Sequence, residues 1–277
     1  MKTAAATHER LLDVMIVTLG ARGLADVLAM DCPRVDGVHY LVCCQNPDGD
    51  DVTQAEASLR ARDDFELHFF DDRGSARNRN HAFDIAAAPY LLLADDDLRF
   101  YPEGLAAVID TLRTNTDVDI AVFRSRTVEP RVFSDTEHDL DKCPRGYYPV
   151  MFEIALRRES VERTGLRFSE LTGVGAPYLC AAEEDLLLER ARRAGLRLRY
   201  YPVEILENTE PTTCTHSALK PPFLRSKGTY MIIAKGFWGA MLRAPIESWR
   251  SRANFFKALY YYLDGCVYAV RHWKELT

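Results

Sequence analysis

Three consecutive aspartates, Asp95, Asp96 and Asp97, follow a short apolar run in the segment YLLLADDDLRF over residues 90–100. Carboxylates this close repel one another at neutral pH unless a cation or several N–H donors compensate them. A hard divalent ion does this well, because Mg²⁺ uses one or two protein carboxylates and completes its shell with water and phosphate oxygens. A solvated turn that caps the next helix is the alternative. The triplet is therefore a candidate metal and phosphate site.

A second candidate anion site lies in the segment DDRGSARNRNHAFDIAAA, residues 71–88. Its apolar spacing predicts a helix that begins near Ser75, the expected N-cap. A helix N-terminus attracts anions, and Arg73, Arg77 and Arg79 would add positive charge and bidentate donors there. A surface helix with ordinary salt bridges is the alternative, but it does not explain why arginines and asparagines crowd the first turns.

A third group of ionisable residues occupies EEDLLLERARRAG, residues 183–195, where a predicted helix ends at Gly195. Acidic residues in a first helical turn complement the helix dipole, so they could act as caps alone. A carboxylate beside a substrate could instead remove a hydroxyl proton as a general base. Both readings stay open on the residues themselves.

The elements that must position these groups are short apolar runs that alternate with helical patterns. Such a pattern predicts a parallel sheet covered on both faces. The right-handed crossover rule places the carboxyl ends of parallel strands on one edge, where ligands of open α/β sheets bind. A lid-like irregular segment is expected over residues 126–148, and Pro202 is expected to end the last strand. The predicted strands cover residues 14–19, 38–44, 65–70, 90–94, 118–123, 150–156 and 196–201.

Composition limits the classes of partner. The 277 residues, 47% hydrophobic and 27% charged, suit one large α/β domain or a domain with a small appendage. A net charge of −6 argues against nucleic acid as a partner. Residues 219–277 nevertheless hold ten Lys or Arg against three Asp or Glu, together with many aromatic residues. This basic segment could contact an anionic membrane face, pack on the domain or form a homodimer contact.

Cysteine usage and apolar runs bear on the compartment. The seven cysteines lack CxxC spacing, which favours reduced thiols in a cytoplasm over a disulfide framework. No apolar run approaches the roughly 18–20 residues needed to span a bilayer. The expected location is the cytoplasm, with peripheral contact to the inner face of the membrane.

Taken in order, the three motifs resemble the family-2 glycosyltransferases of the GT-A fold, over residues 12–202. In that family a DxD motif at a strand end binds a divalent metal and the sugar-nucleotide diphosphate, and Asp95 and Asp97 match it. An arginine–asparagine motif before that strand contacts the nucleotide, and Arg77 and Asn78 match it. A later Glu-Asp pair, followed by a helix and a strand that ends in proline, supplies the base.

The resemblance implies an α/β GT-A (Rossmann-like) domain over residues 10–215, with a mostly parallel sheet flanked by helices. Its nucleotide-binding half would be residues 10–100 and its acceptor half residues 101–215. A helical, basic-aromatic extension would follow at 216–277. The implied reaction is metal-dependent, inverting transfer of a sugar to an acceptor hydroxyl of a cell-surface glycan or natural product. The cofactors would be Mg²⁺ or Mn²⁺ and a UDP-, dTDP- or GDP-sugar.

The resemblance also implies roles for single residues. Counted back from Gly195, the family's Glu-Asp pair falls on Glu183 and Glu184, whereas its letters fall on Glu184 and Asp185. The expected base is therefore Glu184, then Asp185, then Glu183. A loop at residues 173–176 would border the sugar or acceptor. The implied metal ligands are Asp95, Asp97 and His216. The implied donor contacts are Thr18, Gln45, Asp48, Arg73, Arg77, Asn78, Asp95, Asp96 and, in a basic loop at residues 225–228, Arg225 and Lys227.

Three other classes compete with this reading. Sugar-phosphate nucleotidyltransferases have a similar sheet and a Gly-rich first loop, which residues 19–23 match only in part. Haloacid-dehalogenase-like phosphatases also use DxD after a strand, but they carry Thr or Val where this chain has Arg99. A non-catalytic nucleotide-sugar binding protein would be favoured if the acidic motif were misplaced.

Overall fold

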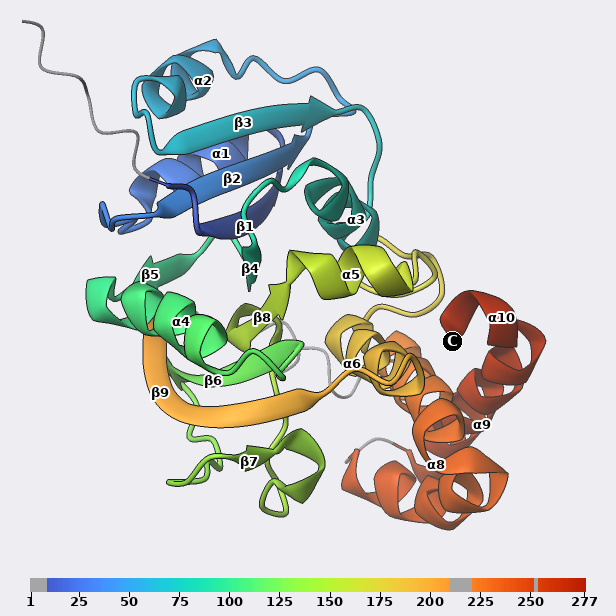
Figure 1. The fold of residues 1–277 in the computed structure, drawn as a ribbon. Coiled ribbons are helices and arrows are strands. Elements are labelled where there is room, and N and C mark those ends of the chain that lie inside the picture. The colour runs from blue at the N-terminus through green and yellow to red at the C-terminus, as the bar shows by residue number, and fades with distance from the viewer. Residues whose placement is uncertain (1–8, 210–220, 252–253) are drawn as a thin grey trace, which may run out of the picture. The chain divides into compact units, whose positions relative to one another are not determined.

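The computed structural model describes residues 9–209, 221–251 and 254–277 (Figure 1). They form two compact units. The sheet unit consists of residues 9–72, 81–165 and 197–209, and the helical unit consists of residues 73–80, 166–196 and the described residues from 221 onward. Each unit is thus built from stretches that are not consecutive in the chain. The predicted division at residues 100 and 215 stays a prediction.

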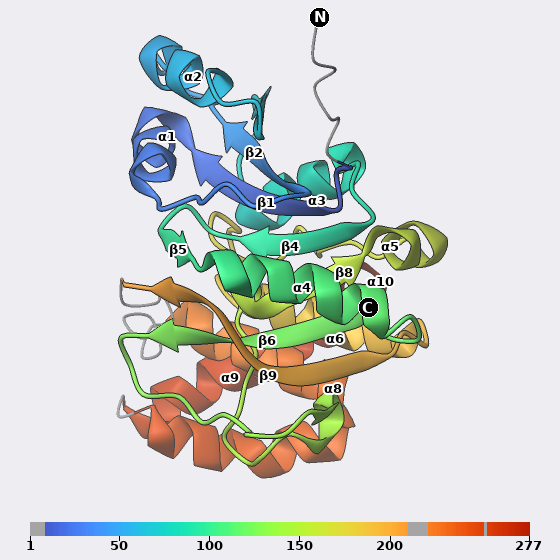
Figure 2. The ribbon, with the colours of Figure 1, turned by 60° about the vertical axis from the view of Figure 1, so that its left-hand side comes forward.

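The sheet unit is built on nine strands, counted over the described residues, in the order β3-β2-β1-β4-β8-β6-β9-β5, with β7 beside β9. Strands β1 to β4 form the parallel part, and their arrowheads point the same way for β1, β2 and β4 in Figure 2. Strands β6 and β9 are also parallel, whereas β5, β7 and β8 pair antiparallel with their neighbours. The α/β GT-A class is confirmed, with its continuous parallel run in the N-terminal half. The bounds are β1 (Leu12–Leu19), β2 (Val38–Gln45), β3 (Phe65–Phe70), β4 (Tyr90–Ala94), β5 (Leu98–Phe100), β6 (Ile120–Thr127), β7 (His138–Asp139), β8 (Ile154–Arg157) and β9 (Leu198–Asn208).

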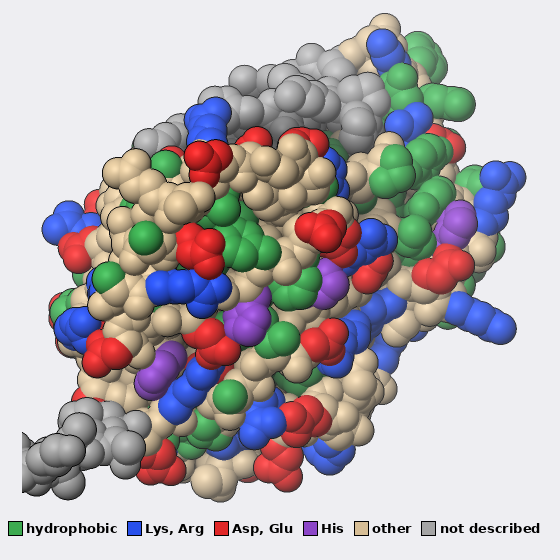
Figure 3. Space-filling view, turned by 90° about the horizontal axis from the view of Figure 1, so that it is seen from above, with side chains coloured by type: hydrophobic (Ala, Val, Ile, Leu, Met, Phe, Trp, Pro, Cys, Tyr) green, Lys and Arg blue, Asp and Glu red, His purple; other side chains and the backbone are tan. Residues whose placement is uncertain are grey.

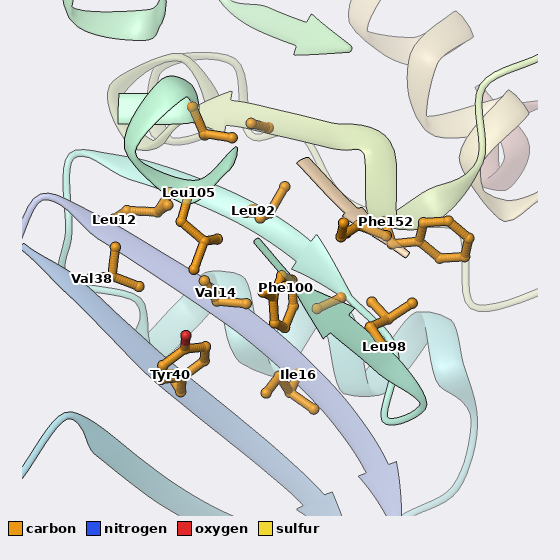
Figure 4. Packing of buried hydrophobic residues seen from close by; sticks show 14 of the residues in the cluster. Leu12, Val14, Ile16, Val38, Tyr40, Leu92, Leu98, Phe100, Leu105 and Phe152 are labelled. Carbon is orange, nitrogen blue, oxygen red and sulfur yellow. The ribbon is translucent and has the colours of Figure 1, made fainter. Parts of the chain in front are cut away.

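One core cluster holds the sheet unit together (Figure 4). Leu12, Val14 and Ile16 alternate along β1 and pack with Val38 and Tyr40 of β2, all of them buried. The intervening residues of β1 are buried as well, as expected for a central parallel strand covered on both faces. The helices beside the sheet are α1 (Gly20–Ala29), α2 (Thr53–Arg60), α3 (Ser75–Ile85), α4 (Pro102–Thr114) and α5 (Arg158–Thr164), and 3₁₀ turns lie at η1 (Leu140–Lys142) and η2 (Met151–Glu153).

Strand β9 corrects one sequence prediction. The strand was expected to end at Pro202, but it continues to Asn208. The pairing with β6 shifts register here, since Val122 lies opposite Tyr200 whereas Arg124 lies opposite Glu204. Proline has no N–H to donate to a ladder and is tolerated in strands at such irregular positions. The proline therefore marks a β-bulge within the strand.

The helical unit contains the helices α6 (Glu183–Arg193), α8 (Pro221–Arg250), α9 (Phe255–Arg271) and α10 (Trp273–Leu276). Helices α8 and α9 run side by side (Figure 1) and share a core cluster that includes Ile232, Ala240 and Tyr262. Gly236, with φ +68°, divides α8 into two parts. As predicted, α6 stops before Gly195, which has φ +76°.

The expected basic loop at residues 225–228 is wrong, because these residues lie inside α8. A Cβ on Gly228 would lie 2.0 Å from the Tyr262 carbonyl oxygen, and one on Gly265 would lie 2.0 Å from that of Arg225. The two glycines therefore let the backbones of α8 and α9 approach closely. Glycine here serves helix packing rather than chain flexibility.

The cysteines of the described residues lie in the core or are partly buried. The described cysteines form no disulfide, and Cys43 and Cys44 are fully buried in β2. No helix among the described residues is long and apolar enough to span a bilayer.

Candidate functional site

The aspartate triplet lies in a bend between β4 and β5. Strand β4 ends at Ala94, and the backbone bends at Asp96 and Asp97 before β5 begins. Side chains alternate between two sides only while the backbone stays extended, so the alternation of β4 does not continue through the triplet. Asp95 and Asp96 are half-buried and Asp97 is exposed.

Asp96 links the ends of β4 and β1. The Thr18 hydroxyl donates to Asp96 Oδ2 at 2.5 Å. Burial raises the pKa of Asp96, the Thr18 hydrogen bond opposes this, and the charge of Asp95 adds to the rise. A Cβ on Gly23 of α1 would lie 1.9 Å from Thr18 Oγ1 and 3.1 Å from Asp96 Oδ2, so the glycine makes room for the pair. Two predicted donor residues, Thr18 and Asp96, thus meet, and Asp95 and Asp97 remain the candidates for a metal.

A polar chain lies at the ends of β2 and β3. The buried Gln45 donates from Nε2 to Asp72 Oδ1 at 2.6 Å, and His81 Nε2 lies 2.8 Å from Asp72 Oδ2. The His81 ring stacks on Phe70 with centroids 4.0 Å apart. Sequence reasoning named Gln45 and missed Asp72 and His81. The only sequence feature that pointed to Asp72 was the polar cluster after β3. Its contact with Gln45 depends on β2 and β3 being neighbours in the sheet.

The loop after β2 is closed by its own side chains. Asn46 Nδ2 donates to the Asp50 carbonyl at 3.0 Å, and the Asp50 amide donates to Asn46 Oδ1 at 3.0 Å. Asp50 Oδ2 in turn accepts from the amide of Ala21 in α1 at 3.0 Å. The predicted donor contact Asp48 is exposed within this loop.

In the helical unit, Glu183 is buried and engaged with the start of α3. Its Oε1 accepts from Ser75 Oγ at 2.5 Å and from Arg79 Nη1 at 3.2 Å. The Ser75 amide donates to the Val174 carbonyl at 3.0 Å. Ser75 is the first helical residue, so the predicted N-cap role is wrong. A Cβ on Gly173 would lie 2.0 Å from Glu183 Oε1, so the 173–176 loop depends on glycine to hold this carboxylate. These contacts give Glu183 a structural role, and they account for its burial without a catalytic one.

The predicted nucleotide contacts of α3 differ in their surroundings. Arg77 is exposed and pairs with Glu170 at 2.8 Å. Asn78 is buried, and Arg73 is exposed. Arg79, which sequence reasoning placed with the anion-binding arginines, is buried with Glu183. Two of the crowded arginines are thus explained in part by acidic partners in the same unit.

Glu184 and Asp185 open helix α6 and are both half-buried. Burial, together with the charges of Asp185 and Glu183, raises the pKa of Glu184 to about 8. Burial raises the pKa of Asp185 to about 6, against the opposing charges of Arg192 and Lys227. Within the part of the chain that the structure describes, no other side chain donates a hydrogen bond to either carboxylate. Both groups thus hold a proton more tightly than ordinary carboxyls.

Arg225 and Lys227 are engaged inside the helical unit. Arg225 Nε lies 2.7 Å from Asp264 Oδ2, and its guanidinium lies 4.5 Å from the centroid of the Tyr178 ring. Lys227 Nζ lies 2.5 Å from the buried Glu247. These contacts hold both side chains on α8 without a ligand.

The donor set at the bend fits a hard divalent ion. No group of three or more His, Cys, Asp or Glu is arranged for a metal in the described ranges, and His216 lies outside them. Asp95 and Asp97 offer oxygen ligands alone. Mg²⁺ bound with a nucleotide needs only one or two such carboxylates, because phosphates and water complete its shell.

Comparison with known proteins finds a family model that matches the middle of the chain. Residues 48–173 match the family model described as glycosyl transferase family 2. This segment carries a family-2 glycosyltransferase domain. The matched residues include the aspartate triplet and the arginine–asparagine motif, whereas Glu184 and Asp185 lie beyond them.

Solved structures give the same fold. The crystal structure of S. aureus TarS 1-349 matches this glycosyltransferase with a TM-score of 0.60 and 15% identity, over 95% of this chain and 91% of that one. The same TarS fragment in complex with UDP-GlcNAc matches with a TM-score of 0.59 and 14% identity, over 95% and 92%. Against the longer S. aureus TarS structure the match covers 93% of this chain and 53% of that one, with a TM-score of 0.55 and 15% identity. A search of curated proteins gave no match.

Proposed function

We propose that this glycosyltransferase is metal-dependent and inverting, and that it moves a sugar from a nucleotide-sugar to an acceptor hydroxyl. The observation that carries the proposal is the bend after β4. There Asp96 is occupied by Thr18, and the oxygen ligands Asp95 and Asp97 lie within the residues that match the family.

The sheet unit would bind the donor. Asp95 and Asp97 would hold Mg²⁺ or Mn²⁺, which would offset the charge that develops on the departing nucleoside diphosphate. The oriented amide of Gln45 and the carboxylate of Asp72 would contact the base and ribose, since together they present donors and acceptors at the ends of β2 and β3. The Thr18–Asp96 pair would shape the same edge of the sheet.

The helical unit would supply the base. Glu184 or Asp185 would accept the proton of the acceptor hydroxyl at a carboxylate oxygen. The acceptor oxygen would bond to the anomeric carbon as the bond from that carbon to the diphosphate oxygen breaks on the opposite face. A carboxylate with a raised pKa suits this step, because a general base works best when its pKa lies near the operating pH.

The choice of donor rests on the structural neighbours. Crystal structures of S. aureus TarS 1-349 hold UDP and UDP-GlcNAc, which favours a UDP-sugar here over dTDP- and GDP-sugars. The reduced state expected for the cysteines favours a cytoplasmic location, where nucleotide-sugars are available. The acceptor would be a cell-surface glycan or a natural product.

Substitution at the bend tests the metal assignment. We expect Asp97→Asn to abolish Mn²⁺-dependent turnover of a UDP-sugar and to remove the Mn²⁺-dependent part of the thermal shift with UDP. EDTA should act on the parent protein in the same way. The matched control is Asp110→Asn, which removes an exposed carboxylate that pairs with Arg113 on α4.

Two outcomes would refute the assignment. One is full metal-dependent turnover in both Asp97→Asn and Asp95→Asn. The other is a parent protein whose turnover is unaffected by EDTA.

A further inference from the structure

The second part of α8, residues 237–250, presents large apolar side chains to solvent. Trp238, Leu242, Ile246 and Trp249 are 77%, 74%, 49% and 78% exposed. Their spacing of four, four and three residues places them along one face of the helix. We call this row the apolar stripe of α8.

The opposite face of this helix is buried and made of small residues. Ala240, Ala244 and Ser248 are buried, and the Tyr262 hydroxyl of α9 donates to the Ala240 carbonyl at 3.2 Å. A surface helix of a globular protein ordinarily turns its large apolar residues inward. In this helix the pattern is reversed, because both tryptophans, Leu242 and Ile246 face solvent while small residues face the core.

Helix α9 repeats the arrangement. Phe256, Tyr260, Val267 and Val270 are exposed at spacings of four, seven and three residues. On the right-hand side of Figure 3, hydrophobic side chains gather and are interspersed with Lys and Arg. Exposed apolar groups in rows of this kind mark surfaces that another body covers.

The charge around these rows is positive. Arg243 and Arg250 follow Leu242 and Trp249 directly and border the stripe of α8. Three acidic residues follow residue 220 in the described chain. The buried Glu247 is shared by Lys227, Arg243 and Arg250, so one carboxylate faces three cations. Asp264 pairs with Arg225, which leaves Glu275 exposed. The exposed basic residues of α8, α9 and α10 are Lys235, Arg243, Arg250, Lys257, Arg271 and Lys274.

We infer that the apolar stripe of α8 docks on an anionic lipid bilayer. Trp, Leu and Ile on one face of a helix, bordered by arginines, suit the boundary between headgroups and acyl chains, where the apolar face is buried and cations meet lipid phosphates. A second copy of the chain would bring the same positive border against itself, and juxtaposed like charges oppose association. The inference is independent of the proposed reaction.

Vesicle flotation with the full chain tests this inference. We expect the protein to float with vesicles of phosphatidylcholine and phosphatidylglycerol at low salt, and to bind pure phosphatidylcholine vesicles far more weakly. Trp238→Ser with Trp249→Ser should abolish flotation. Arg243→Gln with Arg250→Gln should weaken it about 25-fold, since each basic residue near the surface contributes roughly fivefold. Lys227 keeps its pairing with Glu247 in the arginine variant.

An exposed apolar residue outside the helical unit provides the control. Leu28→Ser removes an exposed apolar side chain from α1 and should float like the parent. Absence of flotation at low salt, or unchanged flotation of the double tryptophan variant, would overturn the inference. So would a change of oligomeric state in that variant, measured by light scattering without vesicles, because it would assign the stripe to a second copy. Donor turnover measured without lipid keeps a failure of docking separate from a failure of catalysis.

Discussion

Two acidic sites, one in each unit, differ in how fully hydrogen-bond donors and positive charges compensate their carboxylates. Glu153 in the sheet unit is fully buried and accepts five hydrogen bonds. Arg131 donates from Nη1 and Nη2 at 2.5 and 2.9 Å, Ser125 from Oγ and its amide at 2.7 and 3.1 Å, and the Val150 amide at 3.2 Å. Burial raises the pKa of Glu153, and these donors oppose part of that rise.

Glu184 and Asp185 in the helical unit receive less compensation, since only a backbone hydrogen bond and the charge of Arg79 oppose the rise for Glu184. Neighbouring carboxylates add to the effect of burial on Glu184, and Asp185 receives only the more distant charges of Arg192 and Lys227. The fold surrounds the Glu153 carboxylate with hydrogen-bond donors and a guanidinium. At the start of α6 the raised pKa values mean that Glu184 and Asp185 bind a proton more readily than ordinary carboxylates. The first arrangement is typical of structural carboxylates, and the second is typical of groups that exchange protons with a substrate.

The largest expected effect is on turnover. Glu184→Gln should lower kcat by about 10²–10⁴-fold if Glu184 is the base, because a positioned general base contributes that much. Asp185→Asn is the parallel measurement for the second candidate. Single-turnover assays with a UDP-sugar separate this loss from donor binding. The control is Glu189→Gln, which removes a carboxylate that pairs with Arg193 on the same helix. Near-parental kcat in both variants would exclude the pair as the base.

The next effect is on stability. Glu153→Gln should lower the free energy of unfolding by about 3–5 kcal/mol, because it leaves the buried Arg131 guanidinium without its counter-charge. Urea denaturation measures the loss. Arg131→Met should cost a similar amount, and combining it with Glu153→Met should restore part of the stability, since neither charge is then buried alone. A cost below about 1 kcal/mol in the single variants would show that the pair is not structural.

The smallest effect has the opposite sign. The pKa of Glu184 is about 8 in the folded chain against an ordinary 4.5, so the folded state keeps a proton that the unfolded state has lost between these values. This group therefore lowers stability as pH rises from about 4.5 to about 8. Glu184→Gln should stabilise the protein by on the order of 1 kcal/mol at pH 8.5 and have little effect at pH 4. Thermal unfolding at the two pH values measures the difference, and a loss of stability at pH 8.5 would contradict it.

The sequence predicts elements well where burial follows local periodicity. The first four strands are continuous apolar runs, and burial of β1 on both faces is a property of those residues alone. Gly195 stops α6 as expected. The residue after the last turn adopts a left-handed conformation, which glycine accepts without steric cost in any context. The aspartate triplet ends a strand for the same local reason.

Predictions that depended on partners from elsewhere in the chain were less successful. The sequence does not predict a role for Glu153, because its partner Arg131 is brought to it only by the tertiary fold. Asp72 and His81 complete the surroundings of Gln45 because β2 and β3 are neighbours. In the sequence Pro202 resembles a residue that ends a strand. In the structure the shifted register between β6 and β9 accommodates it within the strand.

By itself, the sequence determined the order of the motifs, the apolar strands and the basic, aromatic character of the C-terminal helices. Only the tertiary structure decided the functions of Gly228 and Gly265, which resemble loop residues but allow two helix backbones to meet. It also decided which face of α8 is exposed, because the small residues Ala240 and Ala244 pack inward and leave the tryptophans outside. The physical reason is that periodicity reports which residues share a face, whereas contact between distant backbones selects the face that is buried.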